Sequence, residues 1–115
     1  IQAPDQRVYS ESGHMEDINH FKPIGYPIVK SAMLGLNRYL ATYWAHRSVR
    51  VNCLIPGAVL NTQSDDLVKN ISYRVPLGRL AEKYEYQEAI AFLASNASSY
   101  MTGQEIIIDG GRSIW

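Results

Sequence analysis

Apolar residues in the first half of the chain recur at helical intervals. They lie three or four positions apart, which places them on one helix face and predicts a helix over residues 26–46. The members of this stripe are Val29, Met33, Leu36, Leu40 and Trp44. Further apolar residues fall on other faces of the same segment. A helix that is apolar over so much of its surface is expected to be buried on two sides, one against a sheet and one against a neighbouring subunit.

Two short apolar segments that end at turn residues predict buried strands. Residues 49–55, VRVNCLI, end at Pro56-Gly57, and the stretch EIIIDGG at residues 105–111 ends at two glycines. Two amphipathic segments between these strands predict helices over residues 65–73, with Asp65 or Ser64 near the start, and over residues 84–94. The order helix, strand, helix, helix, strand is typical of an α/β protein with a parallel sheet.

The first 24 residues show no sustained period and predict a long loop, with a turn of helix around residues 14–20. Long segments without regular structure are uncommon in compact domains and often serve as lids or substrate loops. Two strands alone do not form a stable parallel sheet that is covered on both faces, so we expect further strands beyond this chain. Ile1 in place of an initiator methionine fits processing, trimming or a piece of a longer chain.

Composition and charge narrow the class of protein. The chain has 115 residues, and eleven basic residues balance eleven acidic ones, so charge offers no argument for nucleic acid or an anionic membrane as a partner. No apolar run is long enough to span a bilayer. The single cysteine, Cys53, excludes an internal disulfide and is typical of a reducing compartment, so we expect a cytoplasmic protein.

Tyr26 and Lys30 are the strongest candidates for chemistry. Residues four apart lie on one face of a helix, about one turn apart. An ammonium group stabilises the phenolate form of a neighbouring tyrosine, so such a pair can exchange a proton with a carbonyl or alcohol oxygen. The lysine has donors left to hold a ribose hydroxyl. Taken alone, the spacing is common enough to arise by chance.

Three motifs together resemble the C-terminal half of the short-chain dehydrogenase/reductase family. The first is Tyr26-x-x-x-Lys30 followed directly by Ser-Ala, and the second is RVNCLIPG at residues 50–57. The third combines EAIAFLAS at residues 88–95 with TGQEIIIDGG at residues 102–111. The resemblance covers about residues 24–113. The opening APDQRVY also resembles a subgroup linked to flagellin modification and surface-polysaccharide biosynthesis.

The resemblance implies a fold of which this chain is one part. The family has a doubly wound parallel-sheet, Rossmann-like α/β fold that binds NAD or NADP. The resemblance assigns residues 1–115 to the C-terminal part of one such domain, with residues 1–24 as a loop excursion and residues 25–115 as the catalytic helix, the substrate and cofactor loop and the last strand. The nucleotide-binding half, with the glycine-rich turn and the catalytic serine, would lie upstream of Ile1.

The resemblance also implies roles for seven residues. Tyr26 would be the proton donor and acceptor, and Lys30 would bind the nicotinamide ribose. The turn of Pro56, Gly57 and Val59 would run along the nicotinamide, with the Val59 backbone facing its carboxamide. Asn61 or Thr62 would approach the amide or the pyrophosphate. The residues that select NAD or NADP would lie in the absent half.

Pro27 departs from the Ser or Ala that is usual after the catalytic tyrosine. Proline is tolerated in the first turn of a helix, but it disfavours helical dihedrals at the residue before it. We therefore predict that the helix begins at Pro27 with Tyr26 at its cap.

Other polar residues receive structural interpretations. Ser10 and Ser12 are predicted to be solvated loop residues rather than substitutes for the catalytic serine. The histidines at positions 14, 20 and 46 lack metal-ligand spacing, so no metal is expected. Cys53 is predicted to fill a small space in the core, and Asp109 to shape the turn after the last strand. Arg79 and Glu88 are predicted to form a structural ion pair or cap.

Two functional hypotheses follow. The first is an NAD(P)-dependent oxidoreductase acting on a small alcohol or carbonyl substrate, which the subgroup resemblance extends to a sugar or nucleotide sugar. The alternative is a non-catalytic α/β fragment or assembly module that lacks a cofactor site. In either case the apolar helix over residues 26–46 predicts a homo-oligomer, either a dimer or a tetramer.

Overall fold

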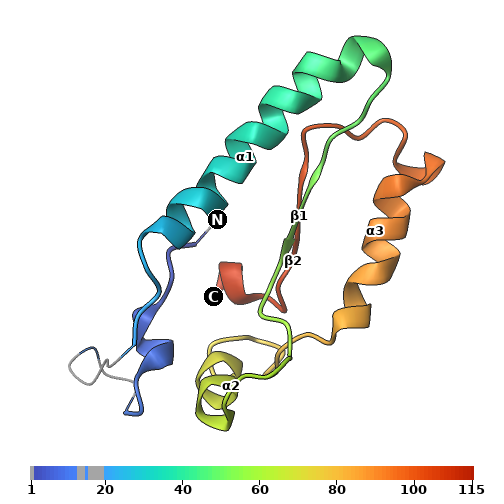
Figure 1. Ribbon diagram of the computed structural model, residues 1–115. Helices are drawn as coiled ribbons and strands as arrows, with labels where there is room; N and C mark the ends of the chain where they lie inside the picture. Colours follow the sequence, from blue (N-terminus) through green and yellow to red (C-terminus); the bar gives the residue numbers. More distant parts are fainter. Residues whose placement is uncertain (1, 13–14, 16–19) are drawn as a thin grey trace.

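The computed structural model describes residues 2–12, 15 and 20–115. Five main elements follow one another along the chain (Figure 1). They are helix α1 (Gly25–Trp44), strand β1 (Cys53–Pro56), helix α2 (Asp65–Ser72), helix α3 (Gln87–Ala94) and strand β2 (Glu105–Ile108). This order confirms the sequence-based prediction, including the Ser64 cap of α2, whose hydroxyl accepts from the Leu67 N–H.

The two strands form a parallel pair in which Cys53 lies opposite Glu105 and Pro56 lies opposite Ile108. Helices α1 and α3 lie on opposite sides of this pair, and both run against the strand direction (Figure 1). The N-terminal end of α1 therefore lies at the same end of the molecule as the carboxyl ends of both strands. In open α/β sheets, ligands bind at that end.

Strand β1 begins four residues later than predicted, because the residues before it use other hydrogen bonds. The Val51 N–H donates to the Thr102 hydroxyl (3.1 Å). The Asn52 side chain donates to the Met101 carbonyl and accepts from the Gln104 N–H. Arg50 donates to main-chain carbonyls at the end of α3 and in the segment after it, among them those of Leu93 and Ser98. These side chains replace the ladder that a longer strand would need.

The helix ends also differ from the prediction. Helix α1 ends at Trp44 and continues as a 3₁₀ turn, Ala45–Arg47, that stops at Ser48 in the left-handed region (φ 57°). The segment predicted as a helix over residues 84–94 is divided into a 3₁₀ turn, Lys83–Tyr86, and α3. Glu82 and Glu85 form a capping box on that turn, which fixes where the helix can start.

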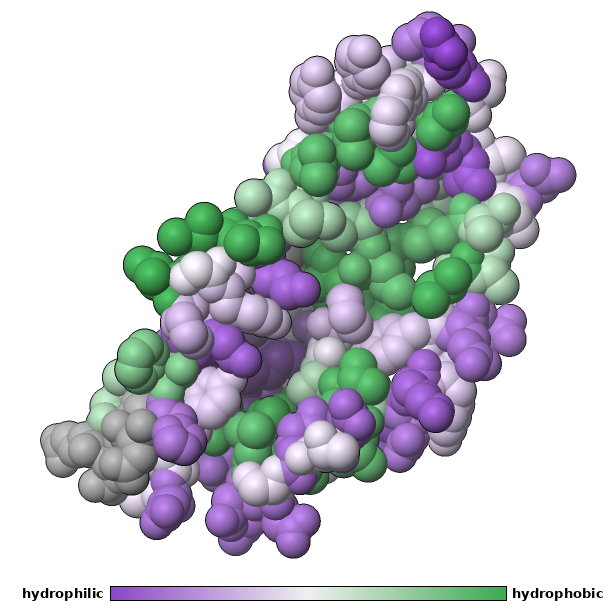
Figure 2. Space-filling view, viewed as in Figure 1, coloured by the Kyte–Doolittle hydropathy of each residue, from purple (hydrophilic) through white to green (hydrophobic). Residues whose placement is uncertain are grey.

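Little of the apolar surface is buried. Among the described residues, the buried apolar side chains are Ala41, Val75, Leu80 and Tyr86. The radius of gyration is 16.6 Å, whereas a compact domain of this length has about 13 Å. Figure 2 shows apolar residues around a hollow between the two outer helices, over the strands. The two-stranded sheet thus leaves apolar surface uncovered, as its strand count predicts.

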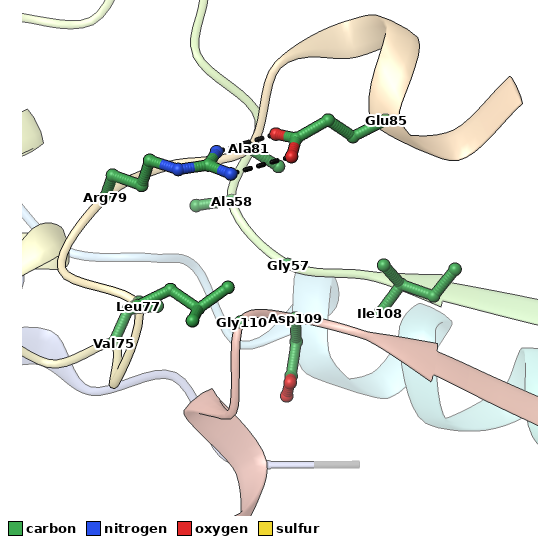
Figure 3. A pocket seen from close by; sticks show the side chains of 10 residues that line it. All are labelled: Gly57, Ala58, Val75, Leu77, Arg79, Ala81, Glu85, Ile108, Asp109 and Gly110. Atoms are coloured by element: carbon green, nitrogen blue, oxygen red, sulfur yellow. Dashed lines mark hydrogen bonds and ion pairs between the residues drawn. The ribbon is translucent and has the colours of Figure 1, made fainter.

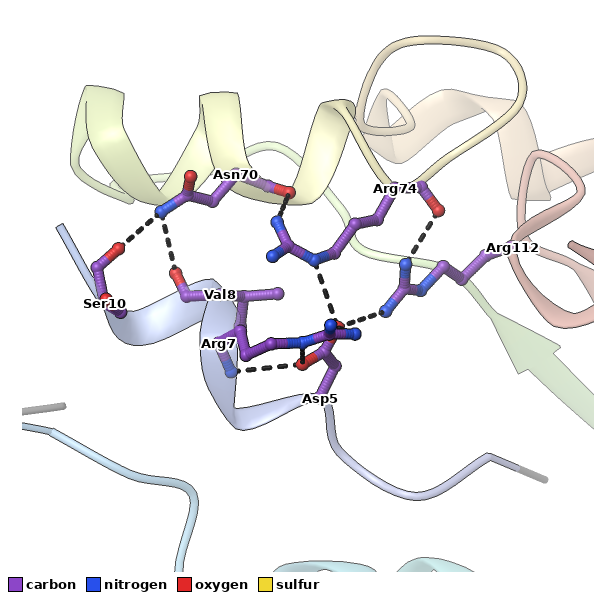
Figure 4. Close-up of polar contacts among 7 residues, drawn as sticks. All are labelled: Asp5, Arg7, Val8, Ser10, Asn70, Arg74 and Arg112. Atoms are coloured by element: carbon purple, nitrogen blue, oxygen red, sulfur yellow. Dashed lines mark hydrogen bonds and ion pairs between the residues drawn. The ribbon is translucent and has the colours of Figure 1, made fainter. Parts of the chain in front are cut away.

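The N-terminal segment packs on α2 instead of forming a free loop. Its 3₁₀ turn, Gln6–Tyr9, lies against α2, and Asn70 of that helix donates to the carbonyls of Val8 and Ser10 (Figure 4). Ser10 is only 2% exposed and its hydroxyl bonds to that of Ser12, so the prediction of a solvated Ser10 is wrong. The predicted helical turn at residues 14–20 lies almost wholly outside the described residues.

Asp5 is the ionic centre of this packing (Figure 4). Its carboxylate accepts from the Nε atoms of Arg7 (2.9 Å) and Arg74 (3.0 Å), and Arg112 Nη2 lies 3.8 Å away. The hydrogen bonds from the Arg7 side chain are the main cause that lowers the pKa of Asp5 from 3.8 to about 2, against the opposing effect of burial. One carboxylate therefore joins the N-terminal segment to the end of α2 and to the C-terminal turn.

Asp5→Asn is expected to destabilise the protein by about 2 kcal/mol at neutral pH, the free energy that corresponds to the lowered pKa. Because the pKa is lower in the folded state, this stabilisation is present above about pH 4 and is lost as the pH falls toward 2. Urea unfolding at pH 7 and pH 3 measures both effects. Glu11→Gln, in the same segment, is the matched control. Equal stability of Asp5→Asn and the wild type at pH 7 would show that the Asp5 carboxylate does not stabilise the fold.

Candidate active site

Tyr26 lies inside the first turn of α1, one residue after the helix begins. The prediction that Pro27 begins the helix is therefore wrong. The carbonyl of Pro23 would ordinarily accept from the N–H of residue 27, which proline lacks. It accepts instead from the Tyr26 N–H at 3.0 Å, so this turn closes one residue earlier. Proline fits here because the first helical N–H groups need no partner within the helix.

Lys30 lies one turn after Tyr26, and the structure brings the two side chains together. The Lys30 ammonium lies 5.6 Å from the centroid of the Tyr26 ring. Tyr26 is 47% exposed and Lys30 is also exposed, so both can be reached by a ligand. A cation at this distance from the ring is attracted to its face.

The second candidate group is the turn that follows β1. The Gly57 N–H donates to the Ile108 carbonyl at 2.8 Å, which extends the pairing of the two strands by one residue. A Cβ atom on Gly57 would lie 2.8 Å from the Asp109 Cα atom, so only glycine fits this approach. Beyond Gly57 the chain pairs with Ala81, whose N–H donates to Ala58 and whose carbonyl accepts from Leu60.

Gly57→Ala is expected to destabilise the protein by about 1–3 kcal/mol, because the added methyl group overpacks against rigid backbone. Gly35→Ala is the matched control. Nothing lies within 4 Å of the Cβ position at Gly35, in the middle of α1, so alanine there should stabilise the helix by about 0.5–1 kcal/mol. Thermal unfolding of both variants measures the difference. A Gly57→Ala variant as stable as the wild type would contradict the close approach of the two strand ends.

Gln63 holds the end of this turn, a role that no sequence motif indicated. Its side chain accepts from the Asn61 N–H (2.6 Å) and donates to the Val59 carbonyl (2.8 Å). Asn61 and Thr62 are exposed, and the Val59 N–H forms no hydrogen bond with another residue in the described part of the chain. The turn therefore presents a free backbone donor and two exposed polar side chains.

Tyr26 and Lys30 on one side and residues 56–62 on the other lie at the same end of the molecule (Figure 1). In residues 2–12, 15 and 20–115, no hydrogen bond or ion pair joins the two groups directly. The structure thus brings the Tyr26 and Lys30 side chains together and places the turn at the same end of the molecule.

A small cavity of about 70 Å³ lies where both strands end, lined by Gly57 and Asp109 among others (Figure 3). Its lining does not include Tyr26 or Lys30. Arg79 and Glu85 form a two-bond ion pair at this cavity, with both distances 2.7 Å. Arg79 therefore pairs with Glu85, not with the predicted Glu88. The Arg79 hydrogen bonds lower the pKa of Glu85 to about 2.

Asp109 shapes the turn after β2, as predicted. Its carboxylate accepts from the N–H groups of Gly111 (2.9 Å) and Ser113 (2.8 Å). Burial alone would raise the pKa of Asp109, but these hydrogen bonds outweigh it and lower the pKa. Gly110 and Gly111 have φ values of 66° and 88°, which favour glycine. Asp109 is therefore engaged in holding the chain, not in chemistry.

Lys22 is the residue at this site that the sequence reasoning missed. Its ammonium lies 4.8 Å from the centroid of the Tyr26 ring and 5.5 Å from that of Tyr9. No spacing rule indicated it, because Lys22 lies before α1, where residues four apart do not share a helix face. The resemblance directed attention to Lys30 alone.

Among residues 2–12, 15 and 20–115, no group of three or more His, Cys, Asp or Glu side chains could hold a metal ion. Within the same ranges, every helix is too short or too polar to cross a bilayer.

The family of the chain follows from comparison with known proteins. The family model described as enoyl-(acyl carrier protein) reductase matches residues 10–113, nearly the whole chain. Together with the fold and the Tyr26–Lys30 pair, this match shows that the chain belongs to the short-chain dehydrogenase/reductase family.

Curated relatives agree with this assignment. The oxidoreductase UcpA of Escherichia coli O157:H7 is 35% identical over 101 residues, which cover 77% of this chain and 38% of UcpA. The 2-dehydro-3-deoxy-D-gluconate 5-dehydrogenase of Dickeya dadantii is 41% identical over 92 residues, covering 75% of this chain and 36% of the enzyme. The chain thus spans little more than a third of the length of these relatives.

Solved structures show the same fold. A short-chain dehydrogenase from Leptospira borgpetersenii with bound NAD+ superposes with a TM-score of 0.83 at 34% identity, covering 96% of this chain and 39% of that protein. A structure described as a putative NAD(P)-dependent gluconate 5-dehydrogenase from Beutenbergia cavernae, with bound NADP at low occupancy, has a TM-score of 0.73 at 38% identity. It covers 78% of this chain and 39% of that protein.

Proposed function

We propose that this chain is the C-terminal part of an NAD(P)-dependent oxidoreductase that interconverts an alcohol and a carbonyl compound. The observation that carries the proposal is the contact between Tyr26 and Lys30 in the first turns of α1. This contact lies at the end of the sheet where the carboxyl ends of both strands point, which is where ligands of α/β folds bind.

The residues present fit a nicotinamide cofactor. The exposed Lys30 ammonium has donors for a ribose hydroxyl, and the Val59 N–H is a free backbone donor for a carboxamide oxygen. Asn61 and Thr62 add exposed polar groups after the turn of Pro56 and Gly57. Relatives solved with NAD+ or NADP support this cofactor class. When bound, the nicotinamide accepts or donates a hydride.

This chain's own residues would handle the proton. In the oxidative direction, Tyr26 as phenolate takes the proton from the substrate hydroxyl. At the same time the carbon that bears this hydroxyl gives up a hydride to the nicotinamide. The O–H and C–H bonds break, and a carbonyl group forms. Lys30 stabilises the phenolate by its positive charge. In the reductive direction, the Tyr26 hydroxyl returns the proton to the carbonyl oxygen. The turn at residues 56–62 would orient the cofactor.

We propose a polyhydroxylated substrate of the sugar class. Two matched proteins are named as dehydrogenases of gluconate or of a deoxygluconate. The two ammonium groups beside the Tyr26 ring, those of Lys22 and Lys30, are hydrogen-bond donors that suit such a substrate. The nucleotide-sugar substrate and the flagellin-linked subgroup remain hypotheses of the sequence alone. With its single cysteine, the protein is proposed to work in the cytoplasm.

We also propose a homo-oligomer formed through α1. Several apolar side chains along this helix are about half exposed: Ile28, Val29, Met33, Leu36, Tyr39 and Tyr43. A contiguous apolar helix face of this kind marks an interaction surface. A dimer or tetramer by light scattering is the expected result, and a monomer would contradict it.

Titration of the complete protein with NADH and NADPH, followed by nicotinamide fluorescence, tests the proposed function. A saturable change with one of them is the expected result. Absence of binding to either cofactor would favour the alternative, a non-catalytic α/β fragment or assembly module. The small buried core of this chain is the observation that supports that alternative.

A further inference from the structure

The Tyr26 ring has a second cation beside it. The ammonium of Lys22 lies 4.8 Å from the ring centroid, closer than that of Lys30 at 5.6 Å. The same Lys22 ammonium lies 5.5 Å from the Tyr9 ring. Cations within about 6 Å of an aromatic ring are attracted to its face, so both tyrosines help to place Lys22.

The backbone of Lys22 is held by a dedicated contact. The Gln6 side chain accepts from the Lys22 N–H (2.9 Å) and donates to the Lys22 carbonyl (3.2 Å), so one amide group pairs with both main-chain groups. Gln6 and Tyr9 belong to the 3₁₀ turn that packs on α2. Asn70 and the ion pair of Asp5 with Arg74 fix that turn. A lysine anchored in this way loses less conformational freedom when it binds a ligand than a free surface lysine does.

The two ammonium groups, those of Lys22 and Lys30, have no carboxylate partner within ion-pair distance in residues 2–12, 15 and 20–115. Both lie beside one ring, so they repel each other unless an anion lies between or beside them. In the proposed function Lys30 faces the cofactor ribose, which leaves the three N–H donors of Lys22 for the substrate.

We propose that Lys22 binds an anionic group of the substrate, a carboxylate or a phosphate, while the reacting carbon lies at the Tyr26 hydroxyl. The complete enzyme then selects acidic members of its substrate class over neutral ones. This inference rests on the proposed function and adds to it the charge of the substrate. Lysine suits the role because its ammonium acts as a compact point charge toward either kind of anion.

The competing interpretation is that Lys22 only covers the two tyrosine rings. In that case its stem and charge would contribute to packing at Tyr9 and Tyr26, and the charge of the substrate would not matter. The two interpretations differ in one measurable respect: a packing role affects all substrates equally, whereas a binding role affects only the anionic ones.

The test compares matched probes with the complete protein and its preferred cofactor. D-gluconate is paired with D-glucitol for the carboxylate, and glycerol 3-phosphate with glycerol for the phosphate. The wild type is expected to oxidise the acidic member of one pair with the higher kcat/KM. Lys22→Gln should lower that kcat/KM by about ten-fold or more, chiefly through KM, because a hydrogen bond to a charged group is lost. The neutral member should change less than about two-fold.

Two further variants complete the design. Lys22→Arg should recover most of the preference because it keeps the positive charge. Lys69→Gln, an exposed lysine near the end of α2, is the matched control and should change neither substrate. Affinity for NADH should be unchanged in Lys22→Gln, which also shows that the variant is folded.

Equal loss for both members of a pair in Lys22→Gln would overturn the inference and leave Lys22 as a packing residue. A wild type that prefers the neutral member of each pair, or oxidises none of the four probes while binding NADH, would overturn it as well. In these cases the proposed oxidoreductase function stands, since cofactor binding is retained. Failure of the wild type to bind NADH or NADPH would instead overturn the proposed function itself.

Discussion

Replacement of Tyr26 by phenylalanine is expected to lower turnover of the complete protein by about 10²- to 10⁴-fold, the usual contribution of a positioned proton donor. The ring and its contacts with Lys22 and Lys30 remain, because both contacts are made with the ring, which phenylalanine keeps. Phenylalanine therefore removes only the group that exchanges the proton. Affinity for NADH or NADPH, measured by fluorescence, should stay within about three-fold of the wild-type value.

The matched control is Tyr39→Phe, the same chemical change further along the same helix. Tyr39 lies in the second half of α1, where it stacks on Tyr43 at 5.7 Å, and its ring is kept in the variant. Its turnover should equal that of the wild type. If Tyr26→Phe and Tyr39→Phe were equally active, Tyr26 would not be the proton donor.

Replacement of Lys30 by alanine has the second largest expected effect, and it should harm both turnover and cofactor affinity. The ammonium group places a positive charge beside the Tyr26 ring and, in the proposed function, holds the nicotinamide ribose. Loss of a hydrogen bond to a charged group predicts about 10- to 100-fold weaker NAD(P)H binding. The fall in kcat should come in addition to this. Steady-state kinetics together with cofactor titration separate the two effects.

Lys69→Ala, which removes an exposed ammonium from α2, is the control for the change in net charge and should alter neither quantity. An effect of Lys30→Ala on kcat alone, with cofactor affinity unchanged, would restrict Lys30 to the tyrosine. If Lys30→Ala changed neither kcat nor cofactor affinity, Lys30 would not belong to the active site.

The elements that the sequence predicted well are those with strong local signals. Helix α1 follows from its apolar stripe, and β2 from its run of isoleucines before Asp109 and two glycines. The predicted start of α1 at Pro27 is wrong. Proline disfavours helical dihedrals at the residue before it. In the structure the hydrogen bond from the Tyr26 N–H to the Pro23 carbonyl holds Tyr26 in the helix. One hydrogen bond at that position outweighs the local dihedral preference that proline imposes.

The interactions that the sequence could not predict join residues far apart along the chain. Asp5 meets Arg74 and Arg112 through the packing of three separate segments, which no spacing rule connects. The two hydrogen bonds between the Gln6 side chain and the Lys22 backbone likewise depend on the 3₁₀ turn that places Gln6 beside Lys22. Glutamine is common at surfaces, so neither Gln6 nor Gln63 carries a signal that distinguishes it before the fold is known.

The most direct test of the account is a single-turnover measurement of hydride transfer, followed by nicotinamide absorbance after the complete protein, its cofactor and an alcohol substrate are mixed. The account predicts rapid formation of the reduced cofactor by the wild type and by Tyr39→Phe, and almost none by Tyr26→Phe with the cofactor fully bound. Reduced cofactor formed by Tyr26→Phe at the wild-type rate would contradict the central claim, that Tyr26 and Lys30 form the proton-transferring part of an NAD(P)-dependent active site.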